Sequence, residues 1–344
     1  MRPLTITVCM RPLPLHRGQK SLLVHLLEEA GHRVRQVEDG PLNLSSVDVL
    51  WISGNANWFP RVCRQLIAAS KRARPFVVIA HGEPLPPPRA AGLPWPRLHL
   101  REVAKIVLRD ARATDVYSNY FRLRQLARHQ IPDLLIVPST GWIEFLAERG
   151  ITAHWSPFAY EPSYGRDLGL SRDIDVLFLG ALDIPRRRRI IRRLRRAGTN
   201  LVVMGSWSDP ACWGDSRTRL LNRTKILLNL ARYPGELAGQ RLALGMANKA
   251  LVISEPIYSP APYVAGKHYV SASVEEMPQA ITYYLTHDAE RERIVAEAHR
   301  FFTEEMTATD SVARVLTLIS EHERFSSDAG GVISREIDSI RKTM

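Results

Sequence analysis

The feature that most constrains this chain is an alternation of short apolar runs with amphipathic stretches of helical length. In the first half, Asp48–Ile52 (DVLWI) and Phe76–Ala80 (FVVIA) are continuous apolar runs, as expected of strands buried on both faces. Between them, Pro60–Arg72 carries its apolar residues at helical spacing. This alternation predicts a parallel sheet covered by helices on both faces.

The same alternation begins again past the middle of the chain. Residues 157–172 contain two prolines and two glycines without an apolar period, which is typical of a linker. Beyond them, Asp175–Leu179 (DVLFL) and Leu201–Met204 (LVVM) are again apolar runs. We therefore expect an α/β protein of two Rossmann-like, doubly wound domains facing a cleft. The expected divisions are an N-terminal domain of residues 1–156, a linker of residues 157–172, a C-terminal domain of residues 173–323 and a polar tail of residues 324–344.

Two local expectations within this scheme can be checked directly against the structure. Asp115–Ser118 (DVYS) is expected to form a short strand of the first sheet. Ser311–Glu323 has helical periodicity and is expected to belong to the second domain, which it follows in sequence.

Composition excludes several classes of protein. The chain has 344 residues, of which 45% are hydrophobic and 24% charged, so it is not mainly disordered. No apolar stretch is long enough to span a bilayer, and the N-terminus lacks the pattern of a signal peptide. The three cysteines are isolated, which favours neither a disulfide framework nor a zinc site. A cytoplasmic location is the simplest expectation.

The charge balance is strongly basic. The formal net charge is +12, and 40 of the 47 basic residues are arginine. A GC-rich genome explains such a bias by composition alone, whereas a dedicated positive field would attract polyanions, including nucleic acid. In the helix expected at Arg186–Ala197, Ile190, Ile191 and Leu194 form the buried stripe. Its arginines then form a solvated face or guide an anionic acceptor.

Several blocks of the second half carry a family resemblance. DVLFLGALDIPRRRRIIRRL, NRTKILLNLARYPGELAGQRLALGMANKALVISEP, PYVAGKHYV and EEMPQAITYYLTHDAERERIVAEAH occur in that order between Asp175 and Leu318. Together they resemble the C-terminal half of a GT-B glycosyltransferase, of the group-1-like branch termed CgeB-like or spore-maturation-type. The resemblance implies transfer of a sugar, with a hexose favoured, from a nucleotide-sugar donor bound by the second domain to a hydroxyl acceptor.

The expected donor residues follow the strands and open the next helix. Gly180 and Gly205 come directly after buried strands, where a missing Cβ lets a ligand approach. Gln240 and Arg241 begin a helix whose free amides suit a diphosphate, and Arg241 is expected at an exposed helix start, where its loss would leave the fold intact. The remaining donor candidates, each with an ordinary structural alternative, are Trp207, Lys225, Arg232, Tyr233, Glu236 and Glu255.

One position departs from the family pattern. Many retaining GT-B enzymes carry a second glutamate, which commonly binds the donor ribose, eight positions beyond the first. Here Glu236 stands at the first position and Leu244 at the second. The departure leaves the nucleotide and the stereochemical outcome open, and it keeps a non-catalytic GT-B-like binding protein as an alternative.

Candidates for acceptor chemistry lie in loops after strands of the first half. His81 and Glu83 follow FVVIA and are expected as general bases, with His16 as a weaker candidate. These loops should share one edge of the sheet, because parallel strands end on the same side. The expected acceptor-side residues are Arg17, Gly18, Asn55 and Asn57.

The remaining chemical motifs are negative. The sequence contains no phosphate loop, no HExxH, no GxSxG and no clear DxD pair. We therefore expect a metal-independent reaction with a UDP- or GDP-sugar as co-substrate and no further cofactor. A polyanionic acceptor, such as DNA with a modified base, is the narrower alternative, because the basic charge would hold its backbone.

Overall fold

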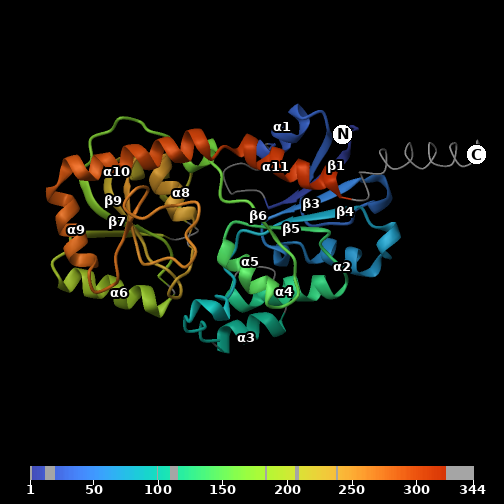
Figure 1. Ribbon diagram of the computed structural model, residues 1–344, viewed down its shortest axis with the longest axis horizontal. Helices are drawn as coiled ribbons and strands as arrows, with labels where there is room; N and C mark the ends of the chain where they lie inside the picture. The colour runs from blue at the N-terminus through green and yellow to red at the C-terminus, as the bar shows by residue number, and fades with distance from the viewer. Residues whose placement is uncertain are drawn as a thin grey trace, which may run out of the picture.

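Two parallel β-sheets lie side by side in the computed structural model (Figure 1), which describes residues 2–11, 20–98, 100–108, 115–182, 184–205, 209–237 and 239–322. The first has six strands in the order β2-β1-β3-β4-β5-β6, and the second has five in the order β11-β10-β9-β7-β8. Every strand pairing is parallel. This architecture confirms the expected pair of Rossmann-like units.

The first sheet is formed by the apolar runs of the first half. Its strands are β1 (Thr5–Met10), β2 (Arg33–Val37), β3 (Val49–Ser53), β4 (Phe76–Ala80), β5 (Leu134–Val137) and β6 (His154–Trp155). Residues on the two faces of these strands alternate between two separate cores, so that Leu50 packs with α2 and Val49 with α1. The helices of this half are α1 (Leu22–Glu29), α2 (Pro60–Ala68), α3 (Leu100–Val107), α4 (Val116–Arg128) and α5 (Thr140–Ala147).

The second sheet repeats this arrangement with its own cores. Its strands are β7 (Ile174–Leu179), β8 (Leu201–Met204), β9 (Thr224–Asn229), β10 (Leu251–Ser254) and β11 (Val270–Ser271). Ile190, Ile191 and Leu194 lie on α6 and are buried against the second sheet, which confirms the stripe expected from the sequence. The helices of this half are α6 (Pro185–Arg196), α7 (Gly214–Asn222), α8 (Gly239–Ala247), α9 (Met277–Thr286) and α10 (Asp288–Arg300).

The last described helix, α11 (Ala308–Glu321), returns to the first sheet. Val312, Val315 and Ile319 pack in the same core as Leu4 and Ile6 of the first half. The sequence had placed this helix with the second domain, which it follows in the chain. The difference has a physical reason, because the apolar stripe of α11 packs beside α1 over the first sheet. The expected tail of residues 324–344 lies outside the described residues.

The strand expected at Asp115–Ser118 is wrong. Asp115 precedes α4, and its carbonyl oxygen accepts hydrogen bonds from the amide of Asn119 and the hydroxyl of Ser118. A segment of four residues fits either a strand or a helix by periodicity alone, and here Val116–Ser118 begin a helix of thirteen residues.

Among the described residues, no helix combines the length and apolar composition needed to cross a bilayer.

Candidate functional site

The carboxyl ends of the strands of the two sheets face each other across a junction closed by direct contacts. The Tyr233 hydroxyl, from the loop after β9, donates to the carbonyl of Leu85, from the loop after β4. The Tyr258 hydroxyl donates to the Glu144 carboxylate of α5 at 2.7 Å. Both contacts join residues far apart in sequence, so the two halves meet along the edge where ligands bind in such sheets.

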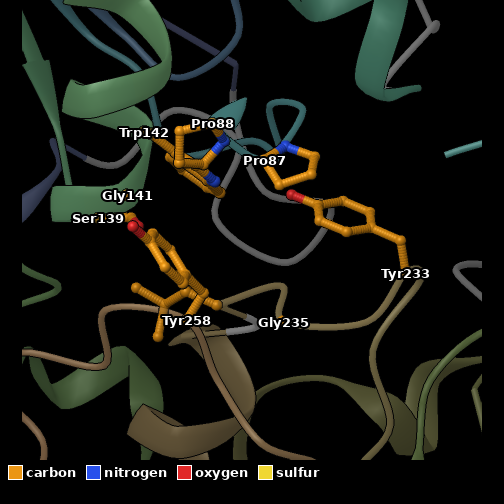
Figure 2. Close-up of a pocket in the computed structure, with 9 residues that line it drawn as sticks. Pro87, Pro88, Ser139, Gly141, Trp142, Tyr233, Gly235 and Tyr258 are labelled. Atoms are coloured by element: carbon orange, nitrogen blue, oxygen red, sulfur yellow. The ribbon is translucent and has the colours of Figure 1, made fainter. Parts of the chain in front are cut away.

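A small pocket lies within this junction. Figure 2 shows the Tyr233 hydroxyl directed toward Pro87, and the Tyr258 ring close to the turn that holds Gly141. A Cβ on Gly141 would lie 3.0 Å from the Tyr258 ring, so this approach depends on the missing side chain. The pocket is lined by both halves of the chain: Pro87, Pro88, Ser139, Gly141, Trp142, Tyr233, Gly235, Leu237 and Tyr258.

Arg241, in the first turn of α8, lies at the ends of β7 and β9. Its Nε donates to Asn229 Oδ1 at 2.8 Å and its Nη2 to the carbonyl of Leu230 at 2.7 Å. Its Nη1 reaches to 3.2 Å from the position that a Cβ on Gly180 would occupy. The sequence expectation of a freely exposed helix start is therefore wrong. The side chain is partly buried, and the ends of the strands hold its guanidinium in place.

Charged groups of both signs surround Arg241, namely Arg187 and Arg232 and, farther than ion-pair distance, the carboxylates of Glu236 and Glu255. Arg187 is buried and donates from its Nε to the same Leu230 carbonyl at 3.0 Å. Both guanidinium carbons lie within 6 Å of the centre of the Phe178 ring, at 5.6 Å for Arg241 and 5.8 Å for Arg187. Burial, followed by the nearby charge of Arg187, lowers the pKa of Arg241 to about 9. No carboxylate of a described residue lies within 4.0 Å of the Arg241 guanidinium. Arg241 is therefore charged at neutral pH and placed to receive an anion.

Glycines allow close packing beside this charge. Gly205, with φ of +147°, packs so closely on Gly180 that a Cβ would lie 2.4 Å from the Gly180 backbone. Only glycine fits there without displacing the end of β7 or of β8. At the start of α8, a Cβ on Gly239 would lie 2.4 Å from the ring of Phe158, which also lies beside Gly82 of the first half. Phe158 thus packs between the loop after β4 and the N-terminus of α8.

Glu255 follows β10 and is already paired. Its carboxylate accepts from both terminal nitrogens of Arg186 and from the amide of Ala231, 2.9 Å away. The side chain of Glu255 is almost fully buried. These bonds fix the start of α6 to the end of β9, so Glu255 lies at the expected edge with both of its oxygens already engaged.

Three charged groups meet where the halves join. The Arg232 guanidinium lies 4.0 Å from Glu83 Oε2 of the first half and 3.9 Å from Glu236 Oε1 of its own loop. Glu236 also accepts from the Arg232 amide. Burial raises the pKa of Glu83, Arg232 offsets part of that rise, and the charge of Glu236 adds to it. A carboxylate with a raised pKa at a domain junction is suited to accept a proton.

His81 follows β4 and is 1% exposed. Neither ring nitrogen has a hydrogen-bond partner among the described residues. Burial lowers the pKa of His81 to about 4, and the nearby Glu83 backbone offsets this only in part. The imidazole is therefore neutral at physiological pH and too weakly basic to be the better of the two proton acceptors.

Other expected residues lie apart or are engaged elsewhere. Lys225 lies near the start of β9, at the opposite edge of the sheet, and pairs with Asp175 at 2.7 Å. Asn55 donates to Asn119 of α4 at 2.6 Å, and Asn57 accepts from Arg122 at 3.0 Å. Gln240 is exposed at the start of α8. The remaining candidates lie outside the described residues: His16, Arg17, Gly18 and Trp207.

Three residues of the site were missed or misjudged from the sequence. Asn229 is the polar residue within the apolar run ILLNL. This break in the apolar pattern could have indicated that the end of the strand binds a polar group, here Arg241. Arg187, expected on a solvated face or as a guide for an anionic acceptor, is buried at the same strand end. Phe158 was assigned to the linker, and nothing in its local pattern indicates its contacts. Leu244, at the position of the missing second glutamate, packs in an apolar core.

Comparisons with known proteins agree with this geometry. Residues 186–317 match the family model described as glycosyl transferase-like. A search of curated proteins finds no significant match. Among solved structures, the Anabaena protein HepE in complex with UDP and glucose is similar with a TM-score of 0.60 at 10% identity, covering 93% of this chain and all of that one.

Two further structures show the same arrangement. Sucrose-phosphate synthase from Thermosynechococcus elongatus has a TM-score of 0.60 at 12% identity, covering 92% of this chain and 98% of that one. The pneumococcal O-GlcNAc transferase GtfA, in complex with UDP and GlcNAc, has a TM-score of 0.51 at 11% identity, covering 81% and 57%. At these identities the likeness establishes the fold, which is that of the GT-B glycosyltransferases.

Proposed function

We propose that this chain is a glycosyltransferase of the CgeB-like branch that transfers a sugar, with a hexose favoured, from a nucleoside diphosphate sugar to a hydroxyl acceptor. The observation that carries the proposal is the guanidinium of Arg241. It is partly buried and fixed to the ends of the strands, and it has no carboxylate among the described residues within ion-pair distance. A fixed cation in such surroundings favours a bound anion.

A diphosphate fits these surroundings better than a single carboxylate does. Arg187 brings a second guanidinium to the same strand end, and α8 directs the amides of its first turn toward the same edge. Gly180 and Gly205 let the ends of β7 and β8 pack closely together beside the Arg241 guanidinium. Of these groups, only Gly180 lies outside residues 186–317, the range that matches the family model. HepE and GtfA, which share the fold, are complexed with UDP, and this supports UDP as the first nucleotide to test.

The proton acceptor in this proposal is Glu83. The acceptor oxygen forms a bond to the anomeric carbon while the bond from that carbon to the diphosphate breaks, and the hydroxyl proton passes to the Glu83 carboxylate. Its raised pKa makes it a better base than an exposed carboxylate. Arg232, 4.0 Å away, offsets part of the rise in the pKa of Glu83 and holds its carboxylate at the junction.

The proposal assigns the charge of the leaving diphosphate to Arg241, Arg187 and the amides of α8. We therefore expect sugar transfer, or slow donor hydrolysis without acceptor, to persist in excess EDTA. A coupled assay that follows the release of UDP from UDP-glucose, with and without EDTA, tests whether the activity persists. A loss of activity in EDTA that magnesium restores would contradict the metal-independent part of the proposal.

Arg241→Gln tests the donor site itself. Glutamine can still donate to Asn229, but the charge-assisted contact to phosphate is lost, which is worth about 1.5–3 kcal/mol. We expect UDP or GDP affinity, measured by calorimetry, to fall about 10- to 150-fold.

Lys225→Met is the matched control, because it removes one positive charge from the opposite edge of the same sheet. It should leave nucleotide affinity unchanged. Equal affinities in wild type and Arg241→Gln, with a lowered Tm in the variant, would show that Arg241 is structural. Tight nucleotide binding with no transfer or hydrolysis of any donor would instead indicate a binding protein with the GT-B fold.

A further inference from the structure

Helix α3 carries its apolar stripe on the solvent side. Leu100 is 89% exposed, Val107 73% and Leu108 78%, and Val103 is also exposed. These residues follow helical spacing and therefore share one face. The opposite face packs toward α4, where the buried carboxylate of Glu102 accepts from the Tyr117 amide at 2.9 Å. A surface helix normally turns its apolar face inward, whereas α3 turns its apolar face to the solvent. This arrangement indicates a partner for the exposed face.

The apolar surface extends beyond α3. Trp95 is 41% exposed and Leu98 49%, and both lie in the segment that leads into the helix. Arg149 stacks on the Trp95 ring at 5.1 Å, and Arg97 is exposed. Within residues 95–98 and 100–108, the only carboxylate is the buried Glu102. The surface therefore combines exposed apolar groups with the positive charges of Arg97 and of Arg149, the latter paired with Glu148 at 2.9 Å.

Helix α6 adds a polyarginine face. Of its exposed arginines, only Arg193 lies within 4.0 Å of a carboxylate of a described residue, that of Glu275. The buried stripe of α6 faces the second sheet, so these arginines point away from it. Figure 1 shows α3 and α6 along the same, lower side of the molecule. The exposed arginines are Arg188, Arg189, Arg192, Arg193, Arg195 and Arg196.

We propose that this side of the protein docks on an anionic lipid bilayer, with the α3 stripe inserted among the acyl chains and the α6 arginines against the phosphate headgroups. An apolar stripe and a polybasic patch are the two signals that together give stable peripheral binding. A second copy of the chain is the poorer occupant, because two arginine-rich surfaces, on chains of net charge +12, repel each other. The proposal does not depend on the donor site.

Flotation with lipid vesicles tests the proposal on the full chain. We expect binding to vesicles of equimolar phosphatidylcholine and phosphatidylglycerol, and little binding to phosphatidylcholine alone. The triple variant Leu100→Ser, Val107→Ser, Leu108→Ser should weaken binding on the order of tenfold or more. The triple variant Arg188→Gln, Arg189→Gln, Arg192→Gln should weaken it by about fivefold per arginine at low salt.

Matched controls test whether the position of the substituted residues matters, or only the loss of exposed apolar or positive groups in general. Val202→Ser with Val264→Ser removes exposed apolar groups elsewhere, and Arg33→Gln, Arg35→Gln, Arg64→Gln removes three exposed arginines from the first half. Both controls should bind vesicles as the wild type does. Wild-type protein that stays unbound, or controls that weaken binding as much as the test variants, would overturn the proposal.

Two further outcomes would assign the surface to another occupant. If the α3 variant changes the mass measured by light scattering and leaves vesicle binding intact, the stripe is an interface between copies. If duplex DNA displaces the protein from vesicles and the α3 variant binds vesicles normally, the arginines bind polyanions in general.

Tryptophan fluorescence tests the same proposal on the wild-type protein. Anionic vesicles should shift the tryptophan emission to shorter wavelength, and Trp95→Phe should reduce that shift.

Discussion

The carboxyl edges of the two sheets use their polar side chains in opposite ways. At the second edge, Arg241 and Arg187 donate to the Leu230 carbonyl and leave positive charge facing the junction. At the first edge, Asn55 is bonded to α4, and the ring nitrogens of His81 have no partner among the described residues. The second edge holds its cations in place before any ligand arrives, whereas the first brings the carboxylate of Glu83 to the junction.

This difference explains why the two edges suit different ligands. A cation held by strand-end carbonyls does not need to reorganise when a phosphate binds, which favours a constant group such as a diphosphate. The first edge contributes loops rather than fixed charges, and loops carry specificity. The difference predicts that changes at the second edge act on donor affinity and that changes at the first act on transfer or on stability.

The largest expected effect belongs to Glu83→Gln. Loss of a general base should lower kcat/KM about 10²- to 10⁴-fold at neutral pH, with donor affinity unchanged. Because the folded-state pKa of Glu83 is raised, the active carboxylate form is lost as pH falls through that raised value. The acid limb of the wild-type pH profile should therefore lie above pH 4.5, the ordinary value for this group, and should be absent from the residual activity of the variant.

Glu144→Gln is the matched control for this prediction. Glu144 also links the two halves, through the Tyr258 hydroxyl, but takes no part in the proposed chemistry. If both variants lose activity equally, Glu83 acts by joining the halves rather than by accepting a proton.

His81 should make stability depend on pH. Its pKa is lowered from 6.5 to about 4 in the folded protein, so the unfolded chain takes up the proton first as pH falls. The stabilisation is complete above about pH 6.5 and is lost progressively down to about pH 4, amounting to about 3 kcal/mol. Urea unfolding should show this decline in the wild type and a correspondingly flatter profile in His81→Gln. Identical profiles would mean that the imidazole is not buried in solution.

A smaller effect is expected for Asn55→Ala. The substitution leaves the buried Asn119 amide without one of its hydrogen bonds, so the free energy of unfolding should fall by about 2 kcal/mol. Asn43→Ala, at an exposed cap, should cost about 0.5 kcal/mol. Acceptor KM should not change in either variant. A raised acceptor KM with unchanged stability would restore the acceptor-side role that the sequence suggests for Asn55.

The sequence predicted the architecture well, because continuous apolar runs such as DVLWI and DVLFL leave few choices other than buried parallel strands. The placement of α11 could not be predicted, because an amphipathic stripe does not specify which sheet it covers. The structure brings together the strand-end glycines and Arg241, which the sequence singles out, and their role in donor binding stays a prediction. What Lys225 and Glu255 bind could not be predicted, because the partners Asp175 and Arg186 are distant in sequence and come close only in the folded sheet.

The central claim is that the carboxyl edge of the second sheet, centred on Arg241, binds the diphosphate of a nucleotide-sugar. A crystal structure of the protein grown with UDP tests it most directly. The account predicts phosphate oxygens within hydrogen-bond distance of the Arg241 guanidinium, beside Gly180 and the first turn of α8. A nucleotide bound against the first sheet, or one bound with its phosphates away from Arg241, would contradict it.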